Sequence, residues 1–335
     1  MRILITGGAG FIGSHITKLL LNEGHEVMVF DNSAGNLERL ENVIASVAKQ
    51  SSSELEIAAS PASWRTPRND NSGMTLLHGD LKDSEALEKA LGGVDAVIHM
   101  ASLIEVSESV KYPLKFAENN IMGSINLLEA MKEKGVKRII FSSSATVYGE
   151  PKTLPLTEGM PLDSANPYAA SKIAVEQFLS AYHKNHGFDV TILRYFNPYG
   201  PGEEHEPETH AIPNFIKNGL DKKPVPLYWK GEQTRDFIYI EDLAKAHTVV
   251  LDQSGFNIFN VGTEQGVRII DVINKLSDIL GYTLEVEDLG DRPGDVRSNY
   301  ASSQKLKEST GWSAQTDLNE GLRKTVEWFK SRENF

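Results

Sequence analysis

A glycine-rich turn near the start of the chain limits its possible folds more than any other feature. The segment "TGGAGFIG" (6–13) follows the continuous apolar run "RILIT" (2–6) and precedes residues with apolar side chains at helical spacing. Glycines let the backbone turn tightly and approach a pyrophosphate, and the amino end of the next helix presents free N–H groups to it. The turn therefore predicts a strand–turn–helix unit that binds a dinucleotide.

The residue that ends the second predicted strand indicates which dinucleotide binds. Asp31 closes the apolar segment "EVMVFD" (26–31). A carboxylate at this place can accept hydrogen bonds from both hydroxyls of the adenosine ribose and repels a 2′-phosphate. The sequence therefore favours NAD over NADP.

The same alternation of apolar runs and helical patterns continues to residue 197 and predicts the fold class. We expect an α/β protein with a Rossmann-type doubly wound parallel sheet and a smaller C-terminal α/β lobe that binds substrate. The expected domains are 1–196, with a return segment near 236–262, for NAD, and 197–335 mainly for substrate. Later strands are predicted at 74–80, 95–101, 138–144 and 189–197, and helices at 37–50, 84–93, 118–135 and 171–187, with a surface excursion at 50–73.

Composition excludes several classes of protein. With 46 acidic against 34 basic residues and a net charge of −12, the chain is not expected to bind nucleic acid. No apolar run approaches the roughly 20 residues of a membrane span, and no signal segment is recognised, so we expect a cytoplasmic enzyme without membrane contact. There is no cysteine, and the nine histidines form no His-x-x-x-His pair, so we expect no metal site.

A tyrosine, a lysine and a serine-rich strand end form the candidate catalytic group. Tyr168 and Lys172 lie four residues apart in "NPYAASK" (166–172), so their side chains share one helix face. Ser144 ends the strand "RIIFSSS" (138–144) at the same expected edge of the sheet. A tyrosine acting as a base near neutrality needs its pKa lowered by roughly three units, which an ammonium and the positive nicotinamide ring favour. We predict that the three side chains handle a proton while NAD accepts a hydride. The alternative is a surface Tyr–Lys pair.

Further segments carry a resemblance to a known family. They are "DN" (31–32), "HGDL" (78–81), "VIHMAS" (97–102), "ENNIMGSINLLEAM" (118–131), "FSSSATVYGE" (141–150), "LRYFNP" (193–198), "TRDFIYIEDLA" (234–244) and "RPGDVR" (292–297). With the glycine turn and "NPYAASK", they make the sequence resemble the extended short-chain dehydrogenase/reductase family, in its NAD-dependent epimerase/dehydratase group, and especially the UDP-glucose (UDP-galactose) 4-epimerases. The resemblance covers nearly the whole chain apart from residues 50–73.

The resemblance implies a set of NAD contacts. Asn32 and Asn36 would bind the adenosine side with Asp31, and Asn120 would support the cofactor from the long helix. Lys172 would also reach the nicotinamide ribose. The full implied set is Gly7, Gly10, Phe11, Ile12, Gly13, Asp31, Asn32, Asn36, Asp80, Leu81, Met100, Ala101, Ser102, Asn120, Ser142, Tyr168, Lys172 and Phe196.

The resemblance also implies the contacts of a UDP-sugar substrate. Arg235 and Arg292 would pair with the diphosphate, for which guanidinium groups offer charge-assisted, fork-shaped donors. Asp295 would hold the uridine ribose. The implied substrate set is Ser144, Thr146, Tyr168, Asn197, Asn214, Tyr228, Arg235, Arg292, Asp295 and Asn299.

The activity implied by the resemblance is 4-epimerisation of a UDP-hexose. Tyr168 would take the proton of the sugar 4-hydroxyl while NAD takes hydride from C4, and hydride would return to the other face of the rotated keto sugar. NAD would stay bound throughout. Helices around 115–134 and 168–186 resemble those that pair in family dimers, so a homodimer is expected.

Three positions depart from the family pattern or narrow it. Thr146 is followed by Val147, not by the acid pair of 4,6-dehydratases, so dehydration is disfavoured. Ile104 stands where many galactose epimerases have lysine, and Asn299 stands where members restricted to plain hexoses have a large aromatic residue. Activity on N-acetylated UDP-sugars is therefore a further hypothesis. UDP-glucuronate decarboxylase or 4-epimerase activity and a non-catalytic NAD sensor are the alternatives.

Overall fold

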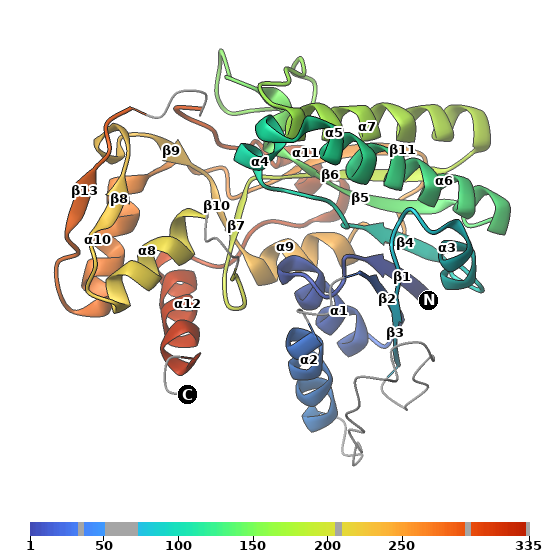
Figure 1. The fold of residues 1–335 in the computed structure, drawn as a ribbon, viewed down its shortest axis with the longest axis horizontal. Coiled ribbons are helices and arrows are strands. Elements are labelled where there is room, and N and C mark those ends of the chain that lie inside the picture. Colours follow the sequence, from blue (N-terminus) through green and yellow to red (C-terminus); the bar gives the residue numbers. More distant parts are fainter. Residues whose placement is uncertain (33–36, 51–72, 205–209, 292–295, 333–335) are drawn as a thin grey trace. The chain divides into compact units, whose positions relative to one another are not determined.

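A seven-stranded sheet organises the first part of the chain (Figure 1). The computed structural model describes residues 1–32, 37–50, 73–204, 210–291 and 296–332. Neighbouring strands from β3 to β5 run parallel. In spatial order, the sheet consists of β11 (Phe256–Val261), β6 (Asp189–Tyr195), β5 (Arg138–Ser144), β4 (Ala96–His99), β1 (Arg2–Thr6), β2 (Glu26–Asp31) and β3 (Met74–His78). This confirms the predicted Rossmann-type doubly wound sheet.

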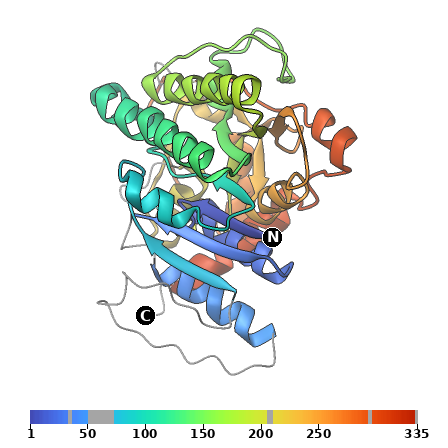
Figure 2. The ribbon, with the colours of Figure 1, turned by 90° about the vertical axis from the view of Figure 1, so that its right-hand side faces the viewer.

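Helices flank the sheet on both faces. Figure 2 shows α6 and α7 on one face and α2 on the other.

Among the described residues, no helix is both long enough and apolar enough to cross a membrane. The helices up to residue 186 are α1 (Phe11–Asn22), α2 (Leu37–Gln50), α3 (Ser84–Ala90), α4 (Val106–Lys111), α5 (Pro113–Phe116), the π-helix η3 (Ala117–Met122), α6 (Gly123–Lys134), the 3₁₀ turn η4 (Ala145–Tyr148) and α7 (Pro167–His186).

The core explains why the strands are continuous apolar runs. Ile3, Leu4 and Ile5 of β1 have no exposed surface. Helices cover both faces of a parallel sheet, so a strand within it needs apolar side chains on both sides. On the α6 and α7 face, Leu127 and Leu179 join the same buried cluster as Leu4.

The strand order reverses between β1 and β4, and this determines where a ligand can bind. The chain moves outward from β1 through β2 to β3, and then returns to the other side of β1 at β4. In open α/β sheets, ligands bind beside the carboxyl ends of the two strands at such a reversal. The glycine turn and the segment after His99 lie at these two strand ends.

The chain divides into two compact units, each built from several segments. The first contains Met1–Val147, Asn166–Leu193 and Ala244–Ile258, and the second contains Tyr148–Ala165, Arg194–Leu243 and Phe259–Phe335. The remaining elements are β7 (Asn197–Tyr199), α8 (Ala211–Leu220), β8 (Val225–Leu227), η5 (Trp229–Gly231), β9 (Thr234–Arg235), β10 (Phe237–Tyr239), α9 (Ile240–Thr248), β12 (Val267–Arg268), α10 (Ile269–Leu280), β13 (Val286–Asp288), α11 (Gln304–Thr310) and α12 (Leu318–Arg332). The predicted division of NAD and substrate binding between domains stays a prediction.

Candidate active site

Two glycines of the turn lie too close to backbone atoms to carry a side chain. Gly7 has φ of +73°, a conformation that favours glycine, and a Cβ there would lie 2.8 Å from the backbone nitrogen of Ala101. A Cβ on Gly13 would lie 2.4 Å from the carbonyl oxygen of Gly7. Gly10 precedes α1, and no side chain caps the first N–H groups of this helix. Phe11 and Ile12 form its first turn. The turn can therefore receive a phosphate at close range.

The end of β2 is bonded to the glycine turn. Asp31 accepts a hydrogen bond from Ala9 N through Oδ2 at 3.0 Å. Asn32 Nδ2 donates to Asp80 Oδ2 at 3.3 Å, so these two predicted adenosine contacts lie together. Leu81 is buried, and its side chain would lie 3.0 Å from a Cβ added at Gly123. Of this group, the structure brings Asn32 and Asp80 together, while Asn36 lies outside the described residues.

The end of β4 is bonded to the end of β1. Thr6 Oγ1 accepts hydrogen bonds from Met100 N at 3.2 Å and from Ala101 N at 3.3 Å. Ser102 Oγ accepts a hydrogen bond from Lys172 Nζ at 3.1 Å. The predicted cofactor segment 100–102 is thus connected both to the glycine turn and to the predicted catalytic lysine.

Lys172 is buried, and its ammonium has defined partners. Only 2% of the residue is exposed, and Nζ also donates to the Ser142 carbonyl oxygen at 2.8 Å. It lies 4.9 Å from the Phe141 ring centroid. Burial lowers the pKa of Lys172 to about 7, although the carboxylate of Glu176 opposes the shift. The lysine can therefore change its charge near neutrality, which a surface lysine does not do.

Tyr168 and Ser144 form the second half of the catalytic group. Tyr168 lies in the first turn of α7, which begins after Asn166, whose Oδ1 accepts a hydrogen bond from Ala169 N at 2.9 Å. The Tyr168 hydroxyl is hydrogen-bonded to Ser144, and Ser144 Oγ accepts from Thr146 Oγ1 at 3.0 Å. Tyr168 is 8% exposed and Lys172 2%, so the interpretation as a surface pair is wrong.

The expected lowering of the Tyr168 pKa is not found in the protein alone. Burial raises this pKa to about 12, and the hydrogen bond with Ser144 opposes the rise. The Lys172 ammonium is directed to Ser102 and Ser142, and it lies 5.9 Å from the centroid of the Tyr168 ring. The protein by itself therefore keeps Tyr168 protonated. The predicted lowering of the pKa includes the positive nicotinamide ring of bound NAD, and it stays a prediction.

Asn120 supports the site from the π-helix η3. Its Nδ2 donates to the Leu103 carbonyl oxygen and to Ser171 Oγ, both at 3.0 Å, and its Oδ1 accepts from Leu103 N at 2.8 Å. Ser171 Oγ in turn donates to the Tyr168 carbonyl oxygen at 2.7 Å. The long predicted helix (118–135) is thus interrupted where it meets the segment after β4, and π-turns often occur at functional sites.

Sequence reasoning missed two buried polar residues of the site. Glu176 is 3% exposed and accepts a hydrogen bond from Ser143 Oγ at 2.6 Å. Its position four residues after Lys172 is a signal that could have found it, because the two side chains share one helix face. His99 is 1% exposed, and its neighbours come from three different elements. Nothing local in the sequence indicates those neighbours.

Several predicted substrate residues lie in the second unit. Asn197 Nδ2 and Asn197 N both donate to the Asp236 carbonyl oxygen at 2.9 Å. Next to it, Arg235 Nη1 donates to the carbonyl oxygens of Thr234 at 2.9 Å and of Arg297 at 3.4 Å. Asn299 N donates to the same Thr234 oxygen at 3.3 Å, so Arg235 and Asn299 are neighbours.

The remaining predicted residues, which are the cofactor contact Phe196 and four substrate contacts, are more dispersed. Phe196 is buried after β6, and its N donates to the Val261 carbonyl oxygen at 3.2 Å. Asn214 lies on α8, where its Oδ1 accepts from Asn218 Nδ2 at 3.0 Å. Tyr228 directly precedes η5. Arg292 and Asp295 lie outside the described residues.

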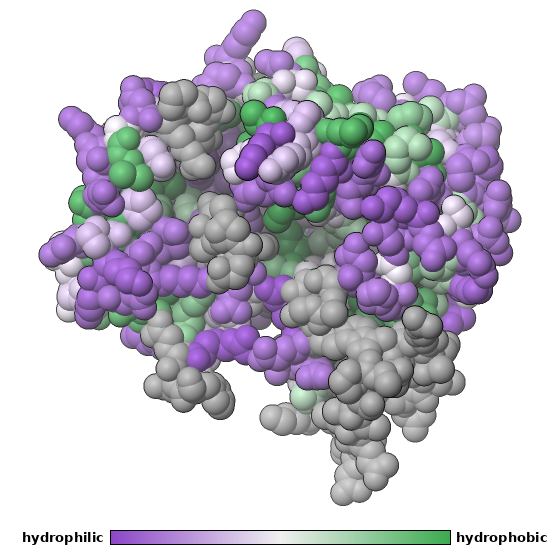
Figure 3. Space-filling model, viewed as in Figure 1, coloured by the Kyte–Doolittle hydropathy of each residue, from purple (hydrophilic) through white to green (hydrophobic). Residues whose placement is uncertain are grey.

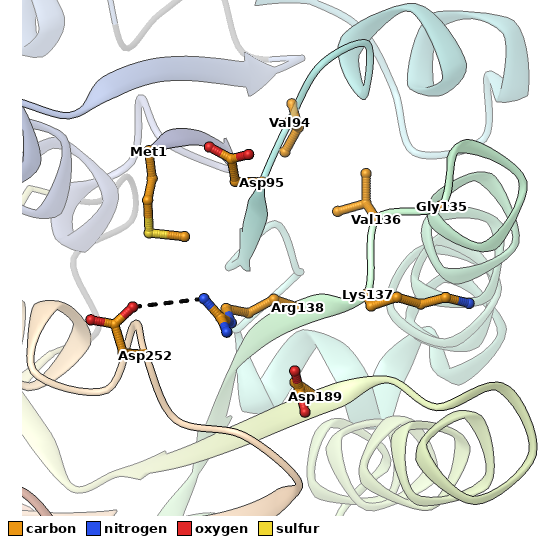
Figure 4. Close-up of a pocket in the computed structure, with 9 residues that line it drawn as sticks. All are labelled: Met1, Val94, Asp95, Gly135, Val136, Lys137, Arg138, Asp189 and Asp252. Carbon is orange, nitrogen blue, oxygen red and sulfur yellow. Dashed lines mark ion pairs between the residues drawn. The ribbon is translucent and has the colours of Figure 1, made fainter.

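An open cavity of 740 Å³ lies at the opposite edge of the sheet (Figure 4). Its residues, which include Met1, Asp95 and Asp189, precede or begin strands, whereas the candidate site follows strand ends. The charged groups there join chain segments: Asp189 Oδ1 accepts from Gly255 N at 2.7 Å, and Arg138 pairs with Asp252 at 3.7 Å. The cavity contains no predicted site residue, and its charges have structural partners.

Comparison with known proteins places this geometry in a family. The model of the NAD dependent epimerase/dehydratase family matches residues 3–262. The chain belongs to this family. UDP-glucose 4-epimerase of Bacillus subtilis (strain 168) is 35% identical over 356 residues, covering 100% of this chain and 98% of that one. The UDP-glucose 4-epimerase of Yersinia enterocolitica is 36% identical over 354 residues, covering 100% and 99%.

Solved structures of epimerases are similar to this member of the family over its whole length. UDP-N-acetylglucosamine 4-epimerase from Methanobrevibacter ruminantium M1, in complex with UDP-N-acetylmuramic acid, is 35% identical with a TM-score of 0.86, covering 99% of this chain and 98% of that one. UDP-glucose 4-epimerase from Bifidobacterium longum, in complex with NAD⁺ and UDP, is 32% identical with a TM-score of 0.84, covering 100% and 99%.

The described residues fit the cofactor that gives the family its name. The turn at Gly7 and Gly13 leaves no room for a Cβ, as close approach of a pyrophosphate requires. Asp31 is the last residue of β2, at the place of an adenosine-ribose acceptor. The buried hydroxyl and ammonium of Tyr168 and Lys172 follow in the same compact unit. The roles of the individual residues stay predictions.

Proposed function

We propose that this protein is a UDP-hexose 4-epimerase that holds NAD throughout its cycle. The observation that carries the proposal is the buried trio of Ser144, Tyr168 and Lys172 in one unit with a glycine turn of the dinucleotide-binding type. Full-length relatives named UDP-glucose 4-epimerase at 35–36% identity support it. Of the alternatives, no specific feature of the described chain favours a decarboxylase or a sensor.

Each side chain of the trio has a separate task in this proposal. Bound NAD supplies the hydride acceptor for C4 of the sugar. Tyr168 takes the proton of the 4-hydroxyl and later returns it, and Ser144 holds the reacting oxygen through a hydrogen bond. Lys172, with an ammonium that titrates near neutrality, supplies positive charge beside the reaction.

The raised pKa of Tyr168 makes its activity conditional on the bound cofactor. At about 12, the phenol stays protonated in the protein alone. Positive charge that arrives with NAD⁺ favours the phenolate, because an opposite charge within a few ångströms stabilises an anion. The Tyr168 phenolate therefore forms only in protein that holds NAD⁺, the hydride acceptor.

The substrate preference rests on Asn299. Its Oδ1 is buried and has no hydrogen-bond partner among the described residues. Buried polar atoms are normally hydrogen-bonded, so this oxygen requires a ligand or a water molecule as its partner. We propose that it faces a polar group of the sugar, and that N-acetylated UDP-hexoses are accepted together with UDP-glucose and UDP-galactose. Turnover of UDP-N-acetylglucosamine that depends on Asn299 supports this proposal, and no turnover contradicts it.

The active form is proposed to be a cytoplasmic homodimer. Large apolar side chains gather on α4, α5 and the neighbouring helices of the first unit, and Figure 3 shows apolar atoms over α4 and α5. Leu114 is 69% exposed and Val110 is 63% exposed. Contiguous exposed apolar patches mark association surfaces, and the absence of cysteine suits a reducing compartment.

The test of the proposed function is conversion without added cofactor. Purified protein incubated with UDP-glucose alone should form UDP-galactose, detected by NMR, because NAD is retained. Tyr168→Phe should lower turnover by roughly 10²–10⁴-fold, the usual contribution of a general acid–base group. The variant should retain its NAD, because the ring stays in place. Full activity of Tyr168→Phe contradicts the proposed mechanism, and absence of any conversion by the unmodified protein contradicts the function.

A further inference from the structure

A buried histidine connects the elements that meet at the candidate site. His99 ends β4, and its Nδ1 lies 2.7 Å from Thr6 Oγ1 at the end of β1. Its Nε2 lies 2.8 Å from Ser124 Oγ on α6. Ser124 Oγ donates to the Asn120 carbonyl oxygen at 2.5 Å, inside the π-helix η3. All four residues are at most 3% exposed.

The partners of this network determine where its protons lie. The single proton of the Ser124 hydroxyl goes to the Asn120 oxygen, so Ser124 Oγ must accept from His99 Nε2–H. Nδ1 of a neutral imidazole is then an acceptor, and it takes the Thr6 hydroxyl proton. Thr6 Oγ1 is left with lone pairs for the N–H groups of Met100 and Ala101, which are its donors. Each donor in the chain finds one acceptor.

A charged imidazole would break this order. Both ring nitrogens would then be donors, so Thr6 Oγ1 would face a third N–H donor with only two lone pairs, and its own hydroxyl would lose its acceptor. Burial and the nearby Lys172 ammonium lower the pKa of His99 to about 3, which agrees with a neutral ring. Lys172 of α7 is the charged group that acts on the ring, and the residues that contact its nitrogens from β1 and α6 carry neutral hydroxyls.

The network ends on residues of the candidate site in both directions. On one side, Thr6 fixes Met100 and Ala101, and the next residue, Ser102, accepts a hydrogen bond from Lys172. On the other side lies Asn120, whose Nδ2 bonds Ser171 Oγ in the turn that carries Tyr168.

We propose that His99 is a positioning residue that is held neutral with its proton on Nε2. Its hydrogen bonds hold the glycine turn, the 100–102 segment and the π-helix around Asn120 in the geometry that Tyr168 and Lys172 require. The proton on Nε2 follows from the hydrogen bonds of the structure alone, whereas the positioning role rests on the proposed function. His99 itself touches neither reacting atom in this proposal.

The position of the proton can be measured directly. ¹⁵N-labelled protein, with the His99 signal assigned by its loss in His99→Gln, should show a protonated Nε2 and an unprotonated Nδ1 at every pH from 5 to 9. Titration of His99 in this range, or a proton on Nδ1, overturns the proposal. Because this readout needs no turnover, it stays valid if the protein proves not to be an epimerase.

The positioning role is tested by removing one link at a time. Ser124→Ala and Thr6→Val should each lower kcat by up to roughly 10²-fold, as small misplacements of reacting groups do, and Thr6→Val should also lower the NAD content of the purified protein. His99→Gln, which keeps a donor and an acceptor, should restore part of the activity lost in His99→Phe.

The matched control is a buried threonine outside the network. Thr17 is fully buried in the same unit, and its hydroxyl has no hydrogen-bond partner among the described residues, so Thr17→Val should leave kcat and NAD content unchanged. If Thr6→Val and Ser124→Ala lose only thermal stability, and keep kcat and NAD content, the positioning role is overturned. If NAD content falls in Thr6→Val but no variant or parent protein converts UDP-sugars, the network stands and the proposed activity fails.

Discussion

Lys172, a predicted catalytic residue, makes the stability of the protein depend on pH. Its folded pKa of about 7 lies below the ordinary value of 10.5, so between these pH values the unfolded chain binds more protons than the folded one. The contribution of Lys172 to stability is therefore fully present above pH 10.5 and is lost as the pH falls through 7. We expect the free energy of unfolding of the NAD-free protein to rise by up to about 1.4 kcal/mol per pH unit inside this window.

Urea denaturation at pH 6, 7, 8 and 9 measures this slope. Lys172→Met should flatten it, because the titrating group is gone. Lys307→Met, which removes an exposed lysine of α11, should leave it unchanged. A slope that survives in Lys172→Met shows that another group causes it.

At the scale of residues, the sequence indicated which side chains gather at the candidate site but not their electrostatics. Ser144, Tyr168 and Lys172 were predicted because their types and spacing suffice to indicate a proton-handling group. His99 and Glu176 were missed because a buried polar side chain is explained by its partners, which come from distant segments. That the pKa of Tyr168 is raised in the protein alone could not be predicted, because the degree of burial cannot be read from spacing.

The glycine turn is the element whose geometry is most demanding. A methyl group at Gly13 would meet the Gly7 oxygen at 2.4 Å and the Gly8 Cα at 2.7 Å, both of which are backbone atoms. Gly13→Ala should therefore shift the turn, lower the free energy of unfolding by about 1–3 kcal/mol, and abolish NAD retention.

Gly92→Ala is the matched control for this element. Its Cβ would have one ordinary contact, at 3.5 Å from the Lys89 oxygen. We expect wild-type stability and NAD content, measured by thermal unfolding and by absorbance of the released cofactor. If Gly13→Ala retains NAD, a phosphate does not approach the turn as closely as proposed.

Elements with strong periodic patterns were predicted nearly to the residue, and irregular ones were not. The observed bounds of β2 (Glu26–Asp31), α2 (Leu37–Gln50) and β5 (Arg138–Ser144) coincide with the predicted ranges. The helix predicted at 118–135 overlaps the π-helix η3 (Ala117–Met122), which no local sequence pattern indicated. A π-turn inserts one residue without changing composition, and here the side-chain bonds of Asn120 stabilise it.

At the scale of the whole molecule, repetition of strand and helix sufficed to predict the sheet, but not the path of the chain between units. Residues 148–165 belong to the second unit although the segments on either side belong to the first. Local patterns report which face of an element is apolar, not which distant segment covers it. The buried bonds of Asn260 with Tyr148 and Leu156, at 2.6 and 2.9 Å, join residues more than 100 positions apart within the second unit.

The exposed apolar surface of the first unit predicts the state of assembly. Six large apolar side chains on α4, α5, η3, α7 and the residue between α4 and α5 are 38–69% exposed, namely Val106, Val110, Tyr112, Leu114, Met122 and Phe178. Exposure of apolar surface to water costs about 25 cal/mol per Å². A second copy of the chain carries the same apolar surface, so the two copies can bury these surfaces against each other. We therefore expect a dimer at micromolar concentration, and we expect Val110→Lys with Leu114→Lys to be monomeric in sedimentation velocity.

A charge on an apolar side chain outside this surface provides the comparison. Val286 and Leu289 belong to the second unit and are 44% and 41% exposed, so Val286→Lys with Leu289→Lys introduces the same charge at another exposed valine and leucine. This double variant should remain dimeric. A monomeric parent protein, or dissociation of both variants alike, contradicts the assignment.

Because Tyr168 and Lys172 lie on α7, which contacts α4 and α5, the monomeric variant should also lose turnover more strongly than it loses NAD. We expect this because the second copy would hold α4 and α5, and these helices would in turn hold α7 in place. The glycine turn, which is the proposed NAD contact, lies between β1 and α1 and would be less affected.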